Sequence, residues 1–236
     1  MEKNRIYEQV GVAMTSRSCA EYEKMFVLNT EELQGKQVLD VAGGASSFTT
    51  EARQKGVLAQ AVDPLYSKTV NEITEHGKQE IELVALKMEK LVNVYNWEFY
   101  GSVEKHRAGR ENSLELFADD YASEDASNRY HAAMLPNLPF ENDTFELVLC
   151  SHFLFLYEEQ FDYDFHLKAI QELLRVCKPG GEVRIYPLLS FRTVEYTRLQ
   201  ELLEELTLMG YIAEKRKSEL PFLPNSEHYM SVGKSH

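Results

Sequence analysis

The segment 38–48, with the sequence VLDVAGGASSF, constrains the fold of this chain more than any other stretch. Its opening valine and leucine are typical of a buried parallel strand, and Asp40 stands at the carboxyl end, where open α/β sheets place their ligands. Gly43 and Gly44 lack a Cβ atom, so the backbone can turn sharply and approach a ligand closely. The pattern predicts a strand, a glycine turn and a helix arranged around a nucleotide-like cofactor.

A second acid follows the next predicted strand, 58–62, as Asp63 before Pro64. An acid at this point can accept two hydrogen bonds from the hydroxyls of a ribose, as in dinucleotide sites about twenty residues after their glycine loop. Ser46 and Ser47 supply hydroxyls that can cap the helix following the glycine turn.

Three further segments complete an ordered pattern. Residues 138–140, Leu-Pro-Phe, lead through a polar turn into an apolar strand that ends at 150–152, Cys-Ser-His. Residues 172–182, ELLRVCKPGGE, read as a helix, a tight turn and the start of another strand. With segment 38–48, they resemble the class I S-adenosylmethionine-dependent methyltransferases, in particular the small-molecule group of the ubiquinone-biosynthesis type. Four such motifs in the expected order are hard to assemble by chance.

This resemblance implies an α/β, Rossmann-like, doubly wound and mostly parallel seven-stranded sheet, with an antiparallel last strand and a helical insertion after strand 2. It also implies S-adenosyl-L-methionine as cofactor and a small-molecule methyl acceptor. The implied cofactor contacts are Asp40, Ala42, Gly43, Gly44, Ser46, Asp63, Pro64, Leu65, Met134, Leu135, Cys150 and Ser151.

The chain departs from the family pattern at two places. Ala42 and Ser46 occupy the first and third glycine positions of the family's loop, and only Gly44 matches. The acid that commonly follows the third strand is also missing, so adenine contacts near Met134 and Leu135 would be made by backbone or apolar groups.

The stretch between Asp63 and a third strand near residues 129–130 is far longer than one crossover helix requires. Apolar residues at helical spacing predict a helix from a break at Gly77 to Trp97, and a shorter helix through 114–117. We expect residues 67–128 to form a helical insertion, or lid, within a single domain spanning 1–236. The candidate substrate contacts are Tyr22, Tyr66, Trp97, Arg107, Arg110 and His152.

Several of these residues have a structural alternative. The arginines suit a carboxylate or phosphate, whereas a lone tryptophan is more often a core anchor. An N-terminal helix capped by Thr15 or Ser16 carries Cys19, Tyr22, Met25 and Phe26 at helical spacing. It could close over the cofactor with Arg17, Tyr22 or Phe26, or could pack against the sheet. A helix over 193–209 and strands over 182–186, 211–215 and 228–232 complete the expected elements.

Methyl transfer from a sulfonium is a direct displacement that needs few catalytic side chains. His152, at the end of the fourth strand, is the candidate base for an acceptor that must lose a proton. The alternative is a hydrogen-bonding role in the wall of the pocket.

The formal net charge of −13 argues against nucleic-acid partners, because phosphate backbones would be repelled. No segment is long enough to span a bilayer, and the charged start 1–5 lacks a cleavable leader pattern, so we expect a cytoplasmic protein. Cys19, Cys150 and Cys177 are scattered, which fits reduced thiols and no metal site. The oligomeric state is left open.

Two rival classes remain. A nicotinamide-dependent dehydrogenase would need the G-x-G-x-x-G spacing, which this loop lacks. A noncatalytic protein that binds S-adenosylmethionine or a partner is compatible with the altered glycine loop.

Overall fold

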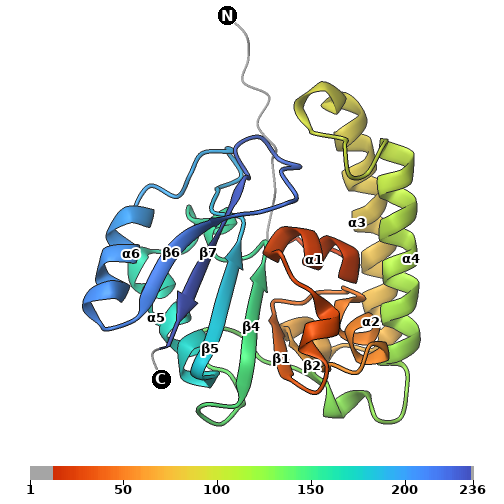
Figure 1. Cartoon of the computed structure of the whole chain (residues 1–236). Coiled ribbons are helices and arrows are strands. Elements are labelled where there is room, and N and C mark those ends of the chain that lie inside the picture. The colour runs from red at the N-terminus through yellow and green to blue at the C-terminus, as the bar shows by residue number, and fades with distance from the viewer. Residues whose placement is uncertain (1–12, 235–236) are drawn as a thin grey trace, which may run out of the picture.

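The computed structural model describes residues 13–234, so the charged start 1–5 lies outside the described part of the chain. A seven-stranded sheet with the order β3-β2-β1-β4-β5-β7-β6 forms its centre (Figure 1). The strands are β1 (Gln37–Val41), β2 (Leu58–Val62), β3 (Tyr130–His131), β4 (Phe145–Ser151), β5 (Cys177–Tyr186), β6 (Ile212–Lys217) and β7 (His228–Gly233). β7 runs antiparallel to both of its neighbours, β5 and β6, and the other neighbouring pairs are parallel. The predicted fold class is confirmed.

Helices cover both faces of this sheet. They are α1 (Cys19–Phe26), α2 (Phe48–Gln54), α3 (Val70–Lys90), α4 (Val103–Tyr121), α5 (Tyr163–Val176) and α6 (Leu199–Leu208). Side chains alternate along β4: Val148 and Cys150 join the core beneath α5 and α6, while Leu147 and Leu149 join the core beneath α1 and α2. A central strand buried on both sides requires this continuous apolar sequence.

The insertion between β2 and β3 consists of the long helices α3 and α4, which lie side by side (Figure 1). Gly77 lies inside α3, and a Cβ atom there would stand 2.8 Å from the methyl groups of Leu114 on α4. The predicted helix break at Gly77 is therefore wrong: the glycine permits close helix packing. The helix expected through 114–117 is the middle of the 19-residue α4.

Two other boundaries differ from expectation. α1 is capped by Ser18, not by Thr15 or Ser16, in a capping box closed by Glu21. α6 begins at Leu199 and not near residue 193, because Thr193 adopts a φ of 58° and the chain first forms a bridge between Leu189 and Glu195.

No helix within residues 13–234 has both the length and the apolar character needed to cross a membrane.

Candidate functional site

Two acids stand at the carboxyl ends of adjacent parallel strands. β1 and β2 pair in register with Val41 opposite Val62, so Asp40 and Asp63 reach the same edge of the sheet. One oxygen of Asp63 accepts the Gly44 N–H at 3.0 Å, and the other accepts the Leu65 N–H at 2.9 Å. A carboxylate offers about four lone-pair sites, so Asp63 keeps the capacity to accept two further hydrogen bonds.

Asp40 is almost completely buried. The hydroxyl of Tyr22, on α1, lies 3.0 and 2.9 Å from its two oxygens. Burial, with a smaller contribution from the nearby Asp63, raises the pKa of Asp40 to about 8, against the opposing effects of the Tyr22 hydrogen bond and the Arg17 charge. Asp40 thus carries a proton over part of the neutral range.

The glycine pair is packed against the protein's own atoms. A Cβ on Gly43 would lie 2.9 Å from both Asp40 Oδ2 and Tyr66 Oη, and Tyr66 donates to the Gly44 carbonyl at 2.9 Å. Gly44 has a φ of +57°, and its Cβ position lies 3.0 Å from the carbonyl oxygen of Thr15. The close approach predicted for a ligand is made here by segment 13–18, which we name the strap.

The strap is held by several elements at once. Met14 is buried in the core between the glycine loop and the insertion helices. The Arg17 carbonyl accepts from Ser46 Oγ at 2.6 Å and Ser47 N at 3.0 Å. The Ser16 carbonyl accepts from Arg110, on α4, at 2.7 Å. Strap, glycine loop and insertion therefore form one closed assembly.

Arg110 also connects the insertion to α1. Its guanidinium contacts Glu21 with N–O distances of 2.9 and 2.7 Å, and both side chains are buried. Tyr100 donates a further hydrogen bond to Glu21 at 2.6 Å. By contrast, the guanidinium of Arg17 has no ion-pair partner within residues 13–234, and it donates a hydrogen bond to Thr15 Oγ1 at 2.5 Å.

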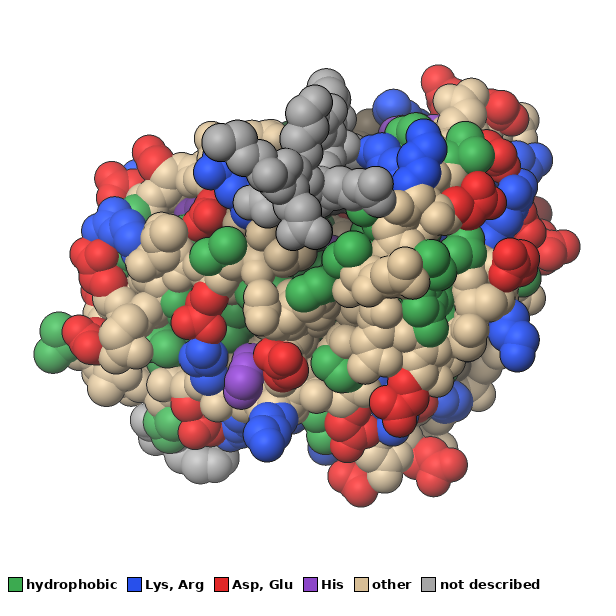
Figure 2. All heavy atoms as spheres, turned by 90° about the horizontal axis from the view of Figure 1, so that it is seen from above, with side chains coloured by type: hydrophobic (Ala, Val, Ile, Leu, Met, Phe, Trp, Pro, Cys, Tyr) green, Lys and Arg blue, Asp and Glu red, His purple; other side chains and the backbone are tan. Residues whose placement is uncertain are grey.

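Aromatic side chains from distant segments pack beside these groups. We call the buried region shared by the strap, the glycine loop, α1 and the insertion the closed crevice. Phe222, between β6 and β7, stacks on His106 of α4 and meets Tyr100 edge-on. The Asn96 N–H donates to the Phe222 carbonyl at 3.0 Å. Seen from above, this end of the molecule shows hydrophobic and uncharged groups near its middle and charged side chains mainly around its rim (Figure 2).

His152 follows β4 at the same edge of the sheet. Its φ of 52° is unusual for a residue with a side chain, and its N–H donates to the Tyr186 carbonyl at 2.6 Å. Nδ1 lies 2.9 Å from Ser151 Oγ, which lies 3.8 Å from the sulfur of Met25. Burial, with the charges of Arg17 and Arg110, holds the pKa of His152 well below its usual value.

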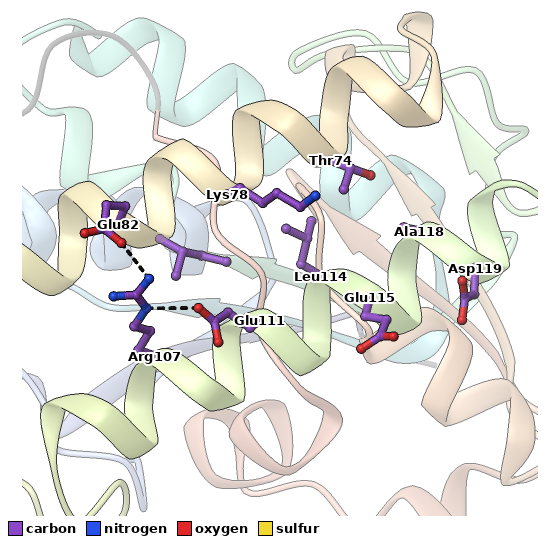
Figure 3. A pocket seen from close by; sticks show the side chains of 10 residues that line it. Thr74, Lys78, Glu82, Arg107, Glu111, Leu114, Glu115, Ala118 and Asp119 are labelled. Carbon is purple, nitrogen blue, oxygen red and sulfur yellow. Dashed lines mark hydrogen bonds and ion pairs between the residues drawn. The ribbon is translucent and has the colours of Figure 1, made fainter.

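The predicted substrate residues separate into two groups. Tyr22, Tyr66, Arg110 and His152 belong to the closed crevice, although the first three are engaged with the protein itself. Arg107 instead lies on an outer groove between α3 and α4, where it pairs with Glu82 and Glu111 (Figure 3).

Trp97 packs with Tyr95 and Phe222 and donates to the Val92 carbonyl at 2.7 Å, as expected of an anchor. Among the predicted cofactor contacts, Met134 is 61% exposed, whereas the side chain of Cys150 is buried in the core.

Three features of the assembly were not predicted from the sequence: the roles of Glu21 and Phe222, and Met25 as a neighbour of Ser151. Tyr100 was a candidate substrate contact, and the structure places it against Glu21. The capping-box spacing Ser18-x-x-Glu21 is visible in the sequence, but nothing local reveals that Glu21 also receives Arg110 from 89 residues away.

Known proteins are similar to this chain in sequence and in fold. A family model described as a methyltransferase domain matches residues 110–185. An uncharacterized protein of Methanocaldococcus jannaschii is 32% identical over 220 residues, which cover 93% of this chain and 95% of that protein.

Two solved structures are similar at low identity. The 1,6-didemethyltoxoflavin-N1-methyltransferase of Burkholderia thailandensis, with bound S-adenosylhomocysteine, is 14% identical with a TM-score of 0.48, covering 92% of this chain and 79% of that one. The magnesium protoporphyrin IX methyltransferase of Synechocystis, with bound S-adenosylmethionine, is 11% identical with a TM-score of 0.46, covering 86% and 72%.

The strand order and the acid and glycine segment at the end of β1 agree with the fold predicted from the sequence, and residues 110–185 match a methyltransferase domain. The chain belongs to the same family as the uncharacterized M. jannaschii protein, which it matches over nearly its whole length.

Proposed function

We propose that the protein transfers a methyl group from S-adenosylmethionine to a small-molecule acceptor. The observation that carries the proposal is the pair of buried acids, Asp40 and Asp63, at the ends of β1 and β2 on either side of a glycine turn. Asp63 retains lone pairs for ribose hydroxyls, and Arg17 offers an unpaired guanidinium to a carboxylate. These residue types fit an adenosyl amino acid.

The crevice is closed in this structure, so binding requires movement of the strap. Thr15 lies against Gly44 and Tyr66 against Gly43, where a cofactor would approach the loop. S-adenosylmethionine, when bound, would supply an electrophilic methyl carbon. The chain's own residues would bind the adenosyl group and hold the acceptor near His152. The aromatic side chains of Tyr100, His106 and Phe222 would exclude water.

The closed crevice also supports a second candidate, a noncatalytic binding protein on the same fold. In that case the Thr15 and Tyr66 contacts with the glycine pair are the permanent state of the loop. Isothermal titration separates the two candidates. Heat with S-adenosylmethionine and S-adenosylhomocysteine supports the cofactor assignment, and absence of heat with either supports the second candidate. Binding of NAD alone would indicate a dehydrogenase.

Asp63 provides the first quantitative test. Asp63→Ala should weaken binding of S-adenosylhomocysteine by about 1–3 kcal/mol, because it removes a charge-assisted acceptor for the ribose. Asp63→Asn keeps one acceptor oxygen, so it removes the charge together with the acceptor of one of the two backbone N–H groups. Glu89→Ala, an exposed acid on α3, is the control. An unchanged dissociation constant in a folded Asp63→Ala protein would refute the ribose assignment.

A further inference from the structure

The side chain of Ser151 lies between two possible partners for its single hydroxyl proton. Its Oγ is 2.9 Å from His152 Nδ1 and 3.8 Å from Met25 Sδ, and the three side chains come from α1, the end of β4 and the residue after it. A hydroxyl has one proton to donate and two lone pairs to accept with. The direction of these two linked hydrogen bonds therefore decides which nitrogen of His152 carries the imidazole proton.

Two arrangements are possible. If Ser151 donates to Nδ1, the proton of the neutral ring sits on Nε2, and the sulfur of Met25 receives no hydrogen bond. If Nδ1 carries the proton, it donates to Ser151 Oγ, and the hydroxyl donates on to Met25. The second arrangement forms two hydrogen bonds, one of them weak because a thioether is a weak acceptor.

The surrounding charges keep the ring of His152 neutral. Arg17 and Arg110 lie within electrostatic range of His152, and both lower its pKa. Glu21, which balances Arg110, is already saturated by Arg110, Tyr100 and Ser18.

Nε2 is free for an incoming group. It makes no hydrogen bond within residues 13–234, so its lone pair can accept one from a bound group. His152 also holds a left-handed backbone conformation, φ 52°, which a β-carbon disfavours and which tends to persist where the surrounding structure imposes it.

We propose that Ser151 is a positioning residue: bridging Met25 and His152, it keeps the proton of His152 on Nδ1 and presents the Nε2 lone pair to the methyl acceptor. The proposal rests on the proposed function for its chemical purpose. As the acceptor atom takes the methyl group, the electron pair of the breaking C–S bond stays on sulfur, and the acceptor's proton moves to Nε2 and then to water. A weak base suffices for a hydroxyl acceptor, because the oxonium that forms when its oxygen gains a methyl group is strongly acidic.

The tautomer can be observed without cofactor or acceptor. Long-range 1H–15N spectra of the 15N-labelled full chain distinguish Nδ1–H from Nε2–H rings, and the signals of His152 among the seven histidines are those lost in His152→Gln. We expect the wild-type ring to be neutral with its proton on Nδ1 between pH 6 and 8.

Two variants test the bridge. Ser151→Ala removes the acceptor for Nδ1–H, and Met25→Leu, a nearly isosteric change, removes the acceptor for the serine hydroxyl. Both should move the His152 proton to Nε2. Ser190→Ala, another buried serine distant in sequence, should leave the tautomer unchanged. Should Ser151→Ala fail to fold, Met25→Leu still decides the matter.

A wild-type ring with its proton on Nε2, or a tautomer that neither variant changes, overturns the proposal. Titration of the same wild-type sample with S-adenosylhomocysteine separates this result from the proposed function: an intact bridge without cofactor binding refutes methyl transfer and leaves the positioning role of Ser151 standing.

Discussion

Asp40 shows how one residue can be unfavourable for the fold while suiting a ligand. Its carboxyl group is almost fully buried and has Tyr22 as its hydrogen-bond donor, so its charged form is poorly stabilised. A ligand with a sulfonium and an ammonium group would add positive charge near this acid, to which Arg17 already contributes. Such a mismatch between stability and binding is typical of functional positions.

The raised pKa of Asp40 determines the direction in which the stability of the protein changes with pH. Because the folded state holds a proton that the unfolded chain releases above its ordinary pKa of 3.8, stability should fall as the pH rises from 4 towards 8, and level off beyond. Asp40→Asn, whose amide oxygen can still accept from Tyr22, should remove this part of the decline. Near pH 8 it should stabilise the protein by on the order of a few kcal/mol.

Urea unfolding of the wild type and of Asp40→Asn at pH 5 and pH 8.5 measures this difference in stability. The contributions of all other titrating groups are the same in both proteins and cancel. The gap in unfolding free energy between variant and wild type should widen with pH. Parallel stabilities at the two pH values would show that Asp40 is not protonated in the folded state.

At the scale of elements, the ion pair between α1 and α4 is the main polar connection of the closed assembly. Arg110 and Glu21 are both buried, and Glu21 receives several donors. Removing one partner of such a pair leaves an uncompensated buried charge. Arg107, three residues earlier on the same helix, makes exposed ion pairs and offers a matched comparison.

We expect Arg110→Met to destabilise the protein by about 3–5 kcal/mol and Arg107→Met by less than about 1 kcal/mol. Adding Glu21→Gln to Arg110→Met should restore a large part of the loss, because no charge then remains buried. Denaturant unfolding of the three variants gives the values. Equal losses for the two arginines would mean that the pair does not hold the elements together.

The sequence predicts well those elements whose structure depends on a local pattern, and those strands that are buried on both faces of the sheet. The strand order, the glycine turn and the two acids follow from segment 38–48 and the motifs after it. The failures come from long-range packing: Gly77 resembles a helix break but serves the contact with Leu114, and Arg107 resembles Arg110 in type yet faces outward. Helical spacing does not tell which arginine meets Glu21.

At the scale of the whole molecule, the closed crevice makes cofactor binding a conformational event. The strap contacts the glycine loop, the core beneath the insertion and α4, so its withdrawal separates several contacts in one step. When such an opening precedes binding, the observed binding rate cannot exceed the opening rate. The concentration dependence of binding therefore reports on the strap.

Stopped-flow binding of S-adenosylhomocysteine, followed by the fluorescence of Trp97, should give a rate that reaches a plateau at high ligand concentration. Met14→Ala should weaken the packing of the strap by roughly 2–5 kcal/mol. Its plateau should rise at least tenfold, since tenfold in rate needs only about 1.4 kcal/mol. Met88→Ala, a similarly buried methionine packed among Ala85 and Val103, is the control and should leave the plateau unchanged. A rate that stays proportional to ligand concentration in all three proteins would mean that the strap does not limit access to the crevice.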